Sequence, residues 1–127
     1  MIQCRRATIE DLKFLVDGNR AIARETEDIE LSEETLSDGV SALLEDDNKG
    51  MYWVATRQDQ VIGQILVTYE WSDWRNGQMW WIQSVYVSPD ARRQGVFKAL
   101  LDHVTYEARD HSAVSYTHLR AHETRIH

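Results

Sequence analysis

The feature that most constrains this chain is an apolar segment, residues 79–87, which stops before Pro89 and is followed by a basic turn that contains Gly95. A segment this apolar predicts a strand that is covered on both faces. From about residue 95 to residue 109, apolar side chains recur at helical spacing. The sequence therefore predicts a buried strand that leads, through a short basic turn, into the N-terminus of a helix.

The first part of the chain predicts one strand and two helices. Residues 2–6 read as a short strand in which apolar and polar side chains alternate. Thr8 and Asp11 have the spacing of a capping box at the start of a first helix. Ser32 can cap a second helix, because acidic residues follow it where the helix dipole favours them.

The middle of the chain completes the expected fold class. Residues 51–57 and 61–71 predict an antiparallel hairpin, in which Gly63 marks a bulge or a point of close approach. The order strand, helix, helix, three strands, helix is typical of an α+β fold with a mostly antiparallel sheet flanked by helices. That order differs from a doubly wound nucleotide fold, and it leaves the function open.

Length, charge and cysteine content limit the classes of function. A chain of 127 residues with 43% apolar residues can bury one core. No segment reaches the roughly 20 apolar residues of a membrane span, so no membrane partner is expected. A net charge of −7 argues against a nucleic-acid partner, because phosphate binding needs a basic face. The single cysteine, Cys4, fits a reducing, cytoplasmic setting and a buried role.

The basic turn before the last predicted helix has the chemistry of an anion site. A helix N-terminus presents unpaired backbone N–H groups and the positive end of the helix dipole, which suit a pyrophosphate. Gly95 allows the phosphates to approach, and Arg92, Arg93 and Lys98 add positive charge. From the glycine alone, an ordinary strand-to-helix turn with solvated arginines remains an equal alternative.

The pattern of this turn resembles the coenzyme A motif of the GNAT acetyltransferases, and the similarity extends over roughly residues 1–110. Arg92 matches the first basic position of that motif and Gly95 its central glycine, while Phe97 departs from the small residue at its end. The resemblance implies an acyl-CoA N-acyltransferase fold and acetyl-CoA as co-substrate, with no metal. The cofactor-binding residues it implies are Val85, Tyr86, Val87, Arg92, Arg93, Gln94, Gly95, Val96, Phe97 and Lys98.

The same resemblance implies a reaction in which an amine attacks the thioester directly. The pantetheine arm inserts beside the strand 79–87, and a backbone N–H of that strand holds the oxyanion. Many members carry a carboxylate as base at the position of Gln83, which has no ionisable group. Glu70 and Asp73 are alternative candidates for this role. The sequence therefore leaves the catalytic base open.

The acceptor is expected to be an amine of a small molecule or a peptide. The acidic run 25–30 lies in the region that shapes the acceptor site in this family, and a negative rim attracts cationic amines. Trp80 and Trp81 must point to opposite faces of their strand, so at least one belongs to the core. Trp71 and Trp74 could line the acceptor pocket instead, although core packing is the simpler interpretation.

The last residues, 113–127, do not continue the pattern. They include His118 and His122, whose spacing superficially resembles a zinc pair. The string 115–124 is similar to a sequencing adapter read through in frame. We therefore expect a partial acetyltransferase domain at 1–112 and a non-native tail at 113–127. The family's last strands and its fourth helix would be missing, and the chain as given would be inactive.

Two other functions stay open from the sequence. One is a non-catalytic acyl-CoA-binding regulatory domain, which the glutamine at position 83 allows. The other is an α+β interaction domain that binds no coenzyme A. A homodimer is an open alternative to a monomer.

Overall fold

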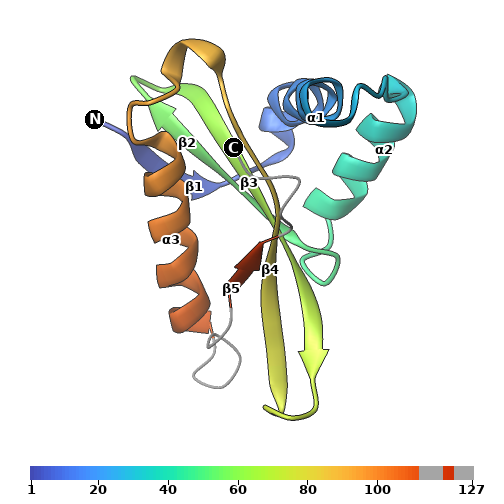
Figure 1. Cartoon of the computed structure of the whole chain (residues 1–127), viewed down its shortest axis with the longest axis vertical. Coiled ribbons are helices and arrows are strands. Elements are labelled where there is room, and N and C mark those ends of the chain that lie inside the picture. Colours follow the sequence, from blue (N-terminus) through green and yellow to red (C-terminus); the bar gives the residue numbers. More distant parts are fainter. Residues whose placement is uncertain (112–118, 122–127) are drawn as a thin grey trace.

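The computed structural model describes residues 1–111 and 119–121. Four strands form an antiparallel sheet in the order β1-β2-β3-β4, with α1 and α2 on one face and α3 on the other (Figure 1). The bounds are β1 Gln3–Arg6, α1 Leu12–Glu27, α2 Glu33–Leu44, β2 Met51–Arg57, β3 Gln60–Ser72, β4 Gly77–Val87 and α3 Val96–His111. The predicted α+β fold class and element order are confirmed.

A fifth, short strand lies at the edge of the sheet. Residues Leu119–Ala121, which fall inside the predicted non-native tail, form β5 and pair in parallel with residues 80–82 of β4. The rest of the predicted tail after residue 112, with His118 and His122, lies outside the described residues. None of the helices in the described ranges is long and apolar enough to cross a membrane.

The central strands divide the core into two layers. In β2, Trp53 and its alternate neighbours face α3, whereas Tyr52 and Val54 face α1 and α2. Trp80 is buried on the α3 side, with its ring 5.9 Å from that of Trp53, while Trp81 is half-buried. The expectation that at least one of the adjacent tryptophans belongs to the core is confirmed.

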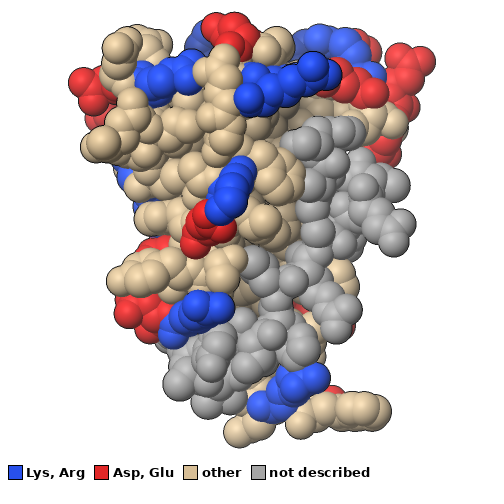
Figure 2. Space-filling view, turned by 60° about the vertical axis from the view of Figure 1, so that its left-hand side comes forward, with Lys and Arg blue, Asp and Glu red and all other residues tan. Residues whose placement is uncertain are grey.

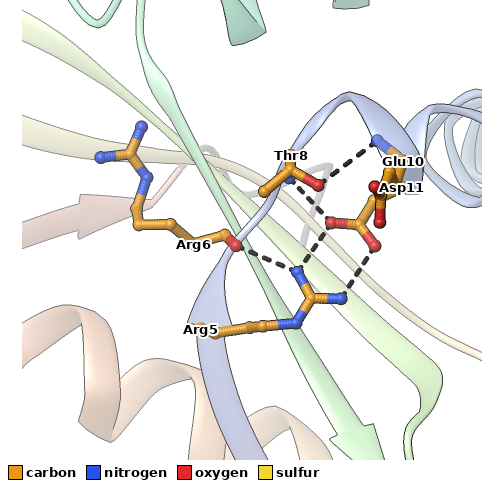
Figure 3. A network of polar contacts seen from close by, with 5 residues as sticks. All are labelled: Arg5, Arg6, Thr8, Glu10 and Asp11. Carbon is orange, nitrogen blue, oxygen red and sulfur yellow. Dashed lines mark hydrogen bonds and ion pairs between the residues drawn. The ribbon is translucent and has the colours of Figure 1, made fainter.

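The start of α1 is fixed by a polar corner (Figure 3). Thr8 and Asp11 form the predicted capping box in a short 3-10 turn. Asp11 is buried and accepts hydrogen bonds of 2.8 Å and 3.0 Å from the Arg5 guanidinium, and one of 2.8 Å from the Thr8 amide. Burial acts to raise the pKa of Asp11, but these hydrogen bonds outweigh it and leave the pKa below its usual value. The corner ties β1 to the first helix.

A bulge interrupts the β3–β4 ladder in the middle of β4. Val67 pairs with Ile82 and Leu66 pairs with Ser84, which leaves Gln83 as an extra residue. Ile82 before the bulge and Val85 after it both belong to the core on the α3 side. In a regular strand, side chains three positions apart point to opposite faces, so the extra residue is what returns Val85 to the same face as Ile82.

The predicted role of Gly63 is also confirmed. A β-carbon at Gly63 would lie 2.8 Å from Cγ1 of Val96, so the glycine allows α3 to approach β3 closely. A second ladder irregularity lies next to it, between Ala55 and Thr56 on β2.

Candidate functional site

A cavity of about 510 Å³ lies where β4 ends and α3 begins. The side chains of α1 form its opposite wall. Nine of the ten residues predicted to bind the cofactor line it, Gln94 being the exception. The lining consists of Ile22, Glu25, Val85, Tyr86, Val87, Ala91, Arg92, Arg93, Gly95, Val96, Phe97 and Lys98.

The backbone of this turn presents unpaired donors. Gly95 has a φ of +86°, in the left-handed region that favours glycine, and its carbonyl accepts the first hydrogen bond of α3 from Ala99. Within the described residues, the amides of residues 93–98 donate to no acceptor. Such a group of free amides at a helix N-terminus is suited to a phosphate or pyrophosphate.

Arg92 is held by the protein itself. Its Nε donates to the Val87 carbonyl at 2.9 Å, and its guanidinium lies 5.6 Å from the centre of the Tyr86 ring. The same guanidinium forms an ion pair of 3.3 Å with Glu25 of α1. Arg92 therefore connects the turn, the end of β4 and α1, which is a positioning role that the sequence motif did not reveal.

The other polar residues of the turn differ in how they are engaged. Lys98 forms an ion pair of 2.7 Å with Asp102 in the next turn of α3. Gln94 donates to the Asp90 carbonyl at 3.0 Å and accepts from Arg57. Arg93 makes no hydrogen bond or ion pair with any described residue. Lys and Arg side chains gather along the upper edge of the molecule, the end where this turn lies, beside acidic ones (Figures 1 and 2).

A second cavity, of about 440 Å³, lies on the α1 side of the sheet beside the bulge. Ile22 lines both cavities. Along β4, Gln83 and Ser84 line the second cavity, and the next residue, Val85, lines the first. The two cavities therefore adjoin between Ser84 and Val85. The second lining consists of Asn19, Ile22, Ala23, Glu27, Ile29, Leu31, Leu66, Thr68, Gln83 and Ser84.

The bulge brings two consecutive polar residues to the second cavity. In a regular strand, Gln83 and Ser84 would point to opposite faces, but the extra residue places both beside α1. The Gln83 side-chain nitrogen donates to the Thr68 hydroxyl at 2.9 Å. Ser84 is buried, and its hydroxyl has no hydrogen-bond partner in the described part of the chain.

The structure does not bring the other two candidate bases to these cavities. Glu70 pairs with Met79 toward the tip of the hairpin, and Asp73 lies in the loop that follows β3. Neither residue lines a cavity described above, and both are exposed. Trp71 and Trp74 belong to the same exposed end of the hairpin.

Sequence reasoning missed the contribution of α1. Asn19 and Ile22 of this helix line the second cavity. Glu27, the last residue of α1, is the only ionisable side chain that lines this cavity among the described residues. The acidic run 25–30 was the one available signal, because it was expected to shape the acceptor site. Among the described residues, no group of three or more His, Cys, Asp or Glu could hold a metal ion.

Comparisons with known proteins show the family and the fold of this chain. A possible acetyltransferase from Clostridium difficile 630 is 43% identical, with a TM-score of 0.88, and the match covers 96% of this chain and 79% of that one. A predicted acetyltransferase with acetyl-CoA from Clostridium acetobutylicum is 21% identical, with a TM-score of 0.73 over 96% of this chain and 80% of that one, which supports the fold alone.

An integron cassette protein from the mobile metagenome of Cole Harbour Salt Marsh is 25% identical, with a TM-score of 0.83, and the match covers 94% of this chain and 76% of that one. A search of curated proteins gave no match. The family model described as "Acetyltransferase (GNAT) family" matches residues 16–126. The chain therefore belongs to the GNAT acetyltransferase family.

Proposed function

We propose that this protein transfers the acetyl group of acetyl-CoA to a primary amine of a small molecule or peptide. The observation that carries the proposal is the meeting of two cavities along β4. One cavity has unpaired amides at a helix N-terminus, and the other has polar groups on a strand bulge. An acyl donor in the first and an acceptor in the second would bring their reacting atoms together beside Ser84 and Val85.

The first cavity fits coenzyme A by its chemistry. The free amides of residues 93–98 would bind the pyrophosphate, and the unpaired Arg93 would add charge at the same place. Among the described residues, β5 pairs only with residues 80–82, so residues 85–87 have no partner strand on that side. An extended pantetheine arm could pair with this edge as an added strand.

The chemistry of the transfer depends on removing a proton from the acceptor. An alkylammonium has a pKa near 10.4, and its nitrogen cannot attack until a proton has left. Gln83 cannot take that proton, but its side-chain oxygen can accept a hydrogen bond from the amine while its nitrogen is held by Thr68. We propose that water at the bulge carries the proton away. The amine nitrogen would then form a bond to the thioester carbon, and a backbone N–H of β4 would stabilise the oxyanion. As the C–S bond breaks, the coenzyme A sulfur would leave as a thiolate, and water would pass the second proton of the nitrogen to it.

A second function is a regulatory domain that binds acyl-CoA without catalysis. The observation that favours it is the absence of an ionisable side chain at Gln83, the bulge residue. Such a domain would use the first cavity and leave the second without a substrate.

One experiment separates the two functions. Acetyl-CoA binding is measured by calorimetry, and release of free thiol is then followed with a panel of primary amines. Activity is best measured on the longest natural reading frame that contains residues 1–112, because residues 113–127 are predicted to be non-native. Binding together with thiol release supports the transferase. Tight binding without release for any amine supports the regulator, and no binding contradicts both.

A further inference from the structure

The ion pair between Glu25 and Arg92 brings a negative charge into the first cavity. Both residues line that cavity, Glu25 from near the end of α1 and Arg92 from the turn before α3. The Nη2 nitrogen of Arg92 lies 3.3 Å from Oε1 and 3.4 Å from Oε2 of Glu25. Among the described residues that line this cavity, Glu25 is the only acidic one. A cavity suited to a phosphate therefore holds a carboxylate against one of its arginines.

Arg92 has two other anchors, which do not depend on Glu25. Its Nε donates to the Val87 carbonyl at 2.9 Å, and its guanidinium lies 5.6 Å from the centre of the Tyr86 ring. The contacts with Glu25 are long for a charge-assisted hydrogen bond, which measures about 2.7–2.9 Å. Both side chains of the pair are also close to half-exposed, and water weakens such a pair. Removal of the Glu25 carboxylate should therefore leave the Arg92 guanidinium in place.

A phosphate in this cavity would compete with Glu25 for the same guanidinium. The Nε of Arg92 is engaged by Val87, so a phosphate must be bound through the terminal nitrogens, one of which contacts Glu25. A phosphate and a carboxylate that share one guanidinium also repel each other, because like charges placed close together are unfavourable. The Arg93 side chain has no such competitor in the described part of the chain. Glu25 therefore opposes the binding of an anion at Arg92 in particular.

We infer that Glu25 is an internal competitor that occupies Arg92 in the empty cavity and lowers the affinity for the pyrophosphate of coenzyme A. The inference deepens the proposed function and rests on it for the identity of the ligand. Glu25 acts through Arg92, so its role is that of a positioning residue. A variant without this carboxylate should bind acetyl-CoA, and coenzyme A as the product, more tightly than the wild-type protein does.

The test is calorimetric titration of coenzyme A into the wild-type protein, Glu25→Gln and Glu30→Gln. We expect Glu25→Gln to lower the Kd for coenzyme A by about 5-fold, the ratio that corresponds to about 1 kcal/mol. The matched control is Glu30→Gln, because Glu30 belongs to the same acidic run, pairs with Arg24 and lines neither cavity. Its Kd should change by less than about 2-fold, since salt screens an exposed charge outside the cavity. A gain of affinity is a result that damage to the fold would not produce.

A double-mutant cycle with Arg92→Gln tests whether Glu25 acts through Arg92. In the Arg92→Gln background, Glu25→Gln should bring little further gain, because no guanidinium is left to compete for. Equal or weaker binding of coenzyme A by Glu25→Gln alone would overturn the inference. The full gain in the Arg92→Gln background, or an equal gain in Glu30→Gln, would also overturn it.

This measurement needs no turnover, so it serves for a transferase and for a regulator alike. Binding of coenzyme A by the wild-type protein with no gain in Glu25→Gln would remove the inference and leave the proposed cofactor site in place. No binding of coenzyme A by the wild-type protein or by any variant would remove both.

Discussion

Replacing Gly63 by alanine should destabilise the protein by overpacking the contact between β3 and α3. The added carbon would lie 2.8 Å from Cγ1 of Val96 and 3.3 Å from Cδ1 of Leu100. Carbon atoms rest about 3.5–4.0 Å apart, so α3 or the strand must move by roughly 0.7 Å. Both neighbours are fully buried and cannot turn aside into solvent. Overpacking of this kind costs about 1–3 kcal/mol.

Thermal and denaturant unfolding would measure this cost, which corresponds to a melting temperature lower by about 4–12 °C for a domain of this size. The matched control is Gly39→Ala, because Gly39 lies within α2 and a β-carbon there would meet nothing within 4 Å. That change should stabilise the protein by up to about 1 kcal/mol. Val96 also lines the first cavity, so coenzyme A affinity should fall with Gly63→Ala. A neutral or stabilising Gly63→Ala would refute the tight contact between β3 and α3.

Two further changes test the corner and the bulge. The pKa of Asp11 is lowered in the folded protein, so its stabilising effect is present above the unfolded value near 3.8 and is lost as the pH falls through the lower folded pKa. Asp11→Asn should therefore cost about 1–3 kcal/mol near neutral pH and remove part of the acid dependence of unfolding, and an unchanged dependence would contradict this. Gln83→Ala should lower kcat by less than the roughly 100-fold expected for loss of a general base. A larger loss in an intact fold would give Gln83 a more direct role.

Local sequence patterns were sufficient to predict most of the fold. The Thr8 and Asp11 capping box, the cap at Ser32 and the apolar residues of β4 each depend on neighbours within a few positions. The basic turn was predictable for the same reason, because Gly95 and the residues around it form most of the lining of the first cavity from one continuous segment, which Ile22 and Glu25 of α1 complete. Of the ten residues predicted to bind the cofactor, only Gln94, which is hydrogen-bonded to Asp90 and Arg57, lies outside that lining.

The second cavity could not be predicted because it depends on contacts between distant segments. Gln83 and Ser84 share a face only because the register between β3 and β4 shifts at the bulge. That shift cannot be read from a single sequence. Asn19 and Glu27 become lining residues only when α1 packs against the bulge. Glu70 and Asp73 are carboxylates of the same hairpin as Gln83, but the register places Glu70 opposite Met79 and Asp73 in the loop beyond β3, away from both cavities.

The most direct test of the account is calorimetric titration of acetyl-CoA into the wild-type protein and into Gly95→Glu. Gly95 lines the first cavity, and a carboxylate there would oppose the pyrophosphate while its β-carbon strains a backbone with φ of +86°. A β-carbon at Gly95 meets nothing within 4 Å, so the fold should persist, and circular dichroism checks this. We predict saturable binding by the wild-type protein and none by Gly95→Glu in the same fold. Equal affinity of the two proteins would contradict the assignment of the coenzyme A site.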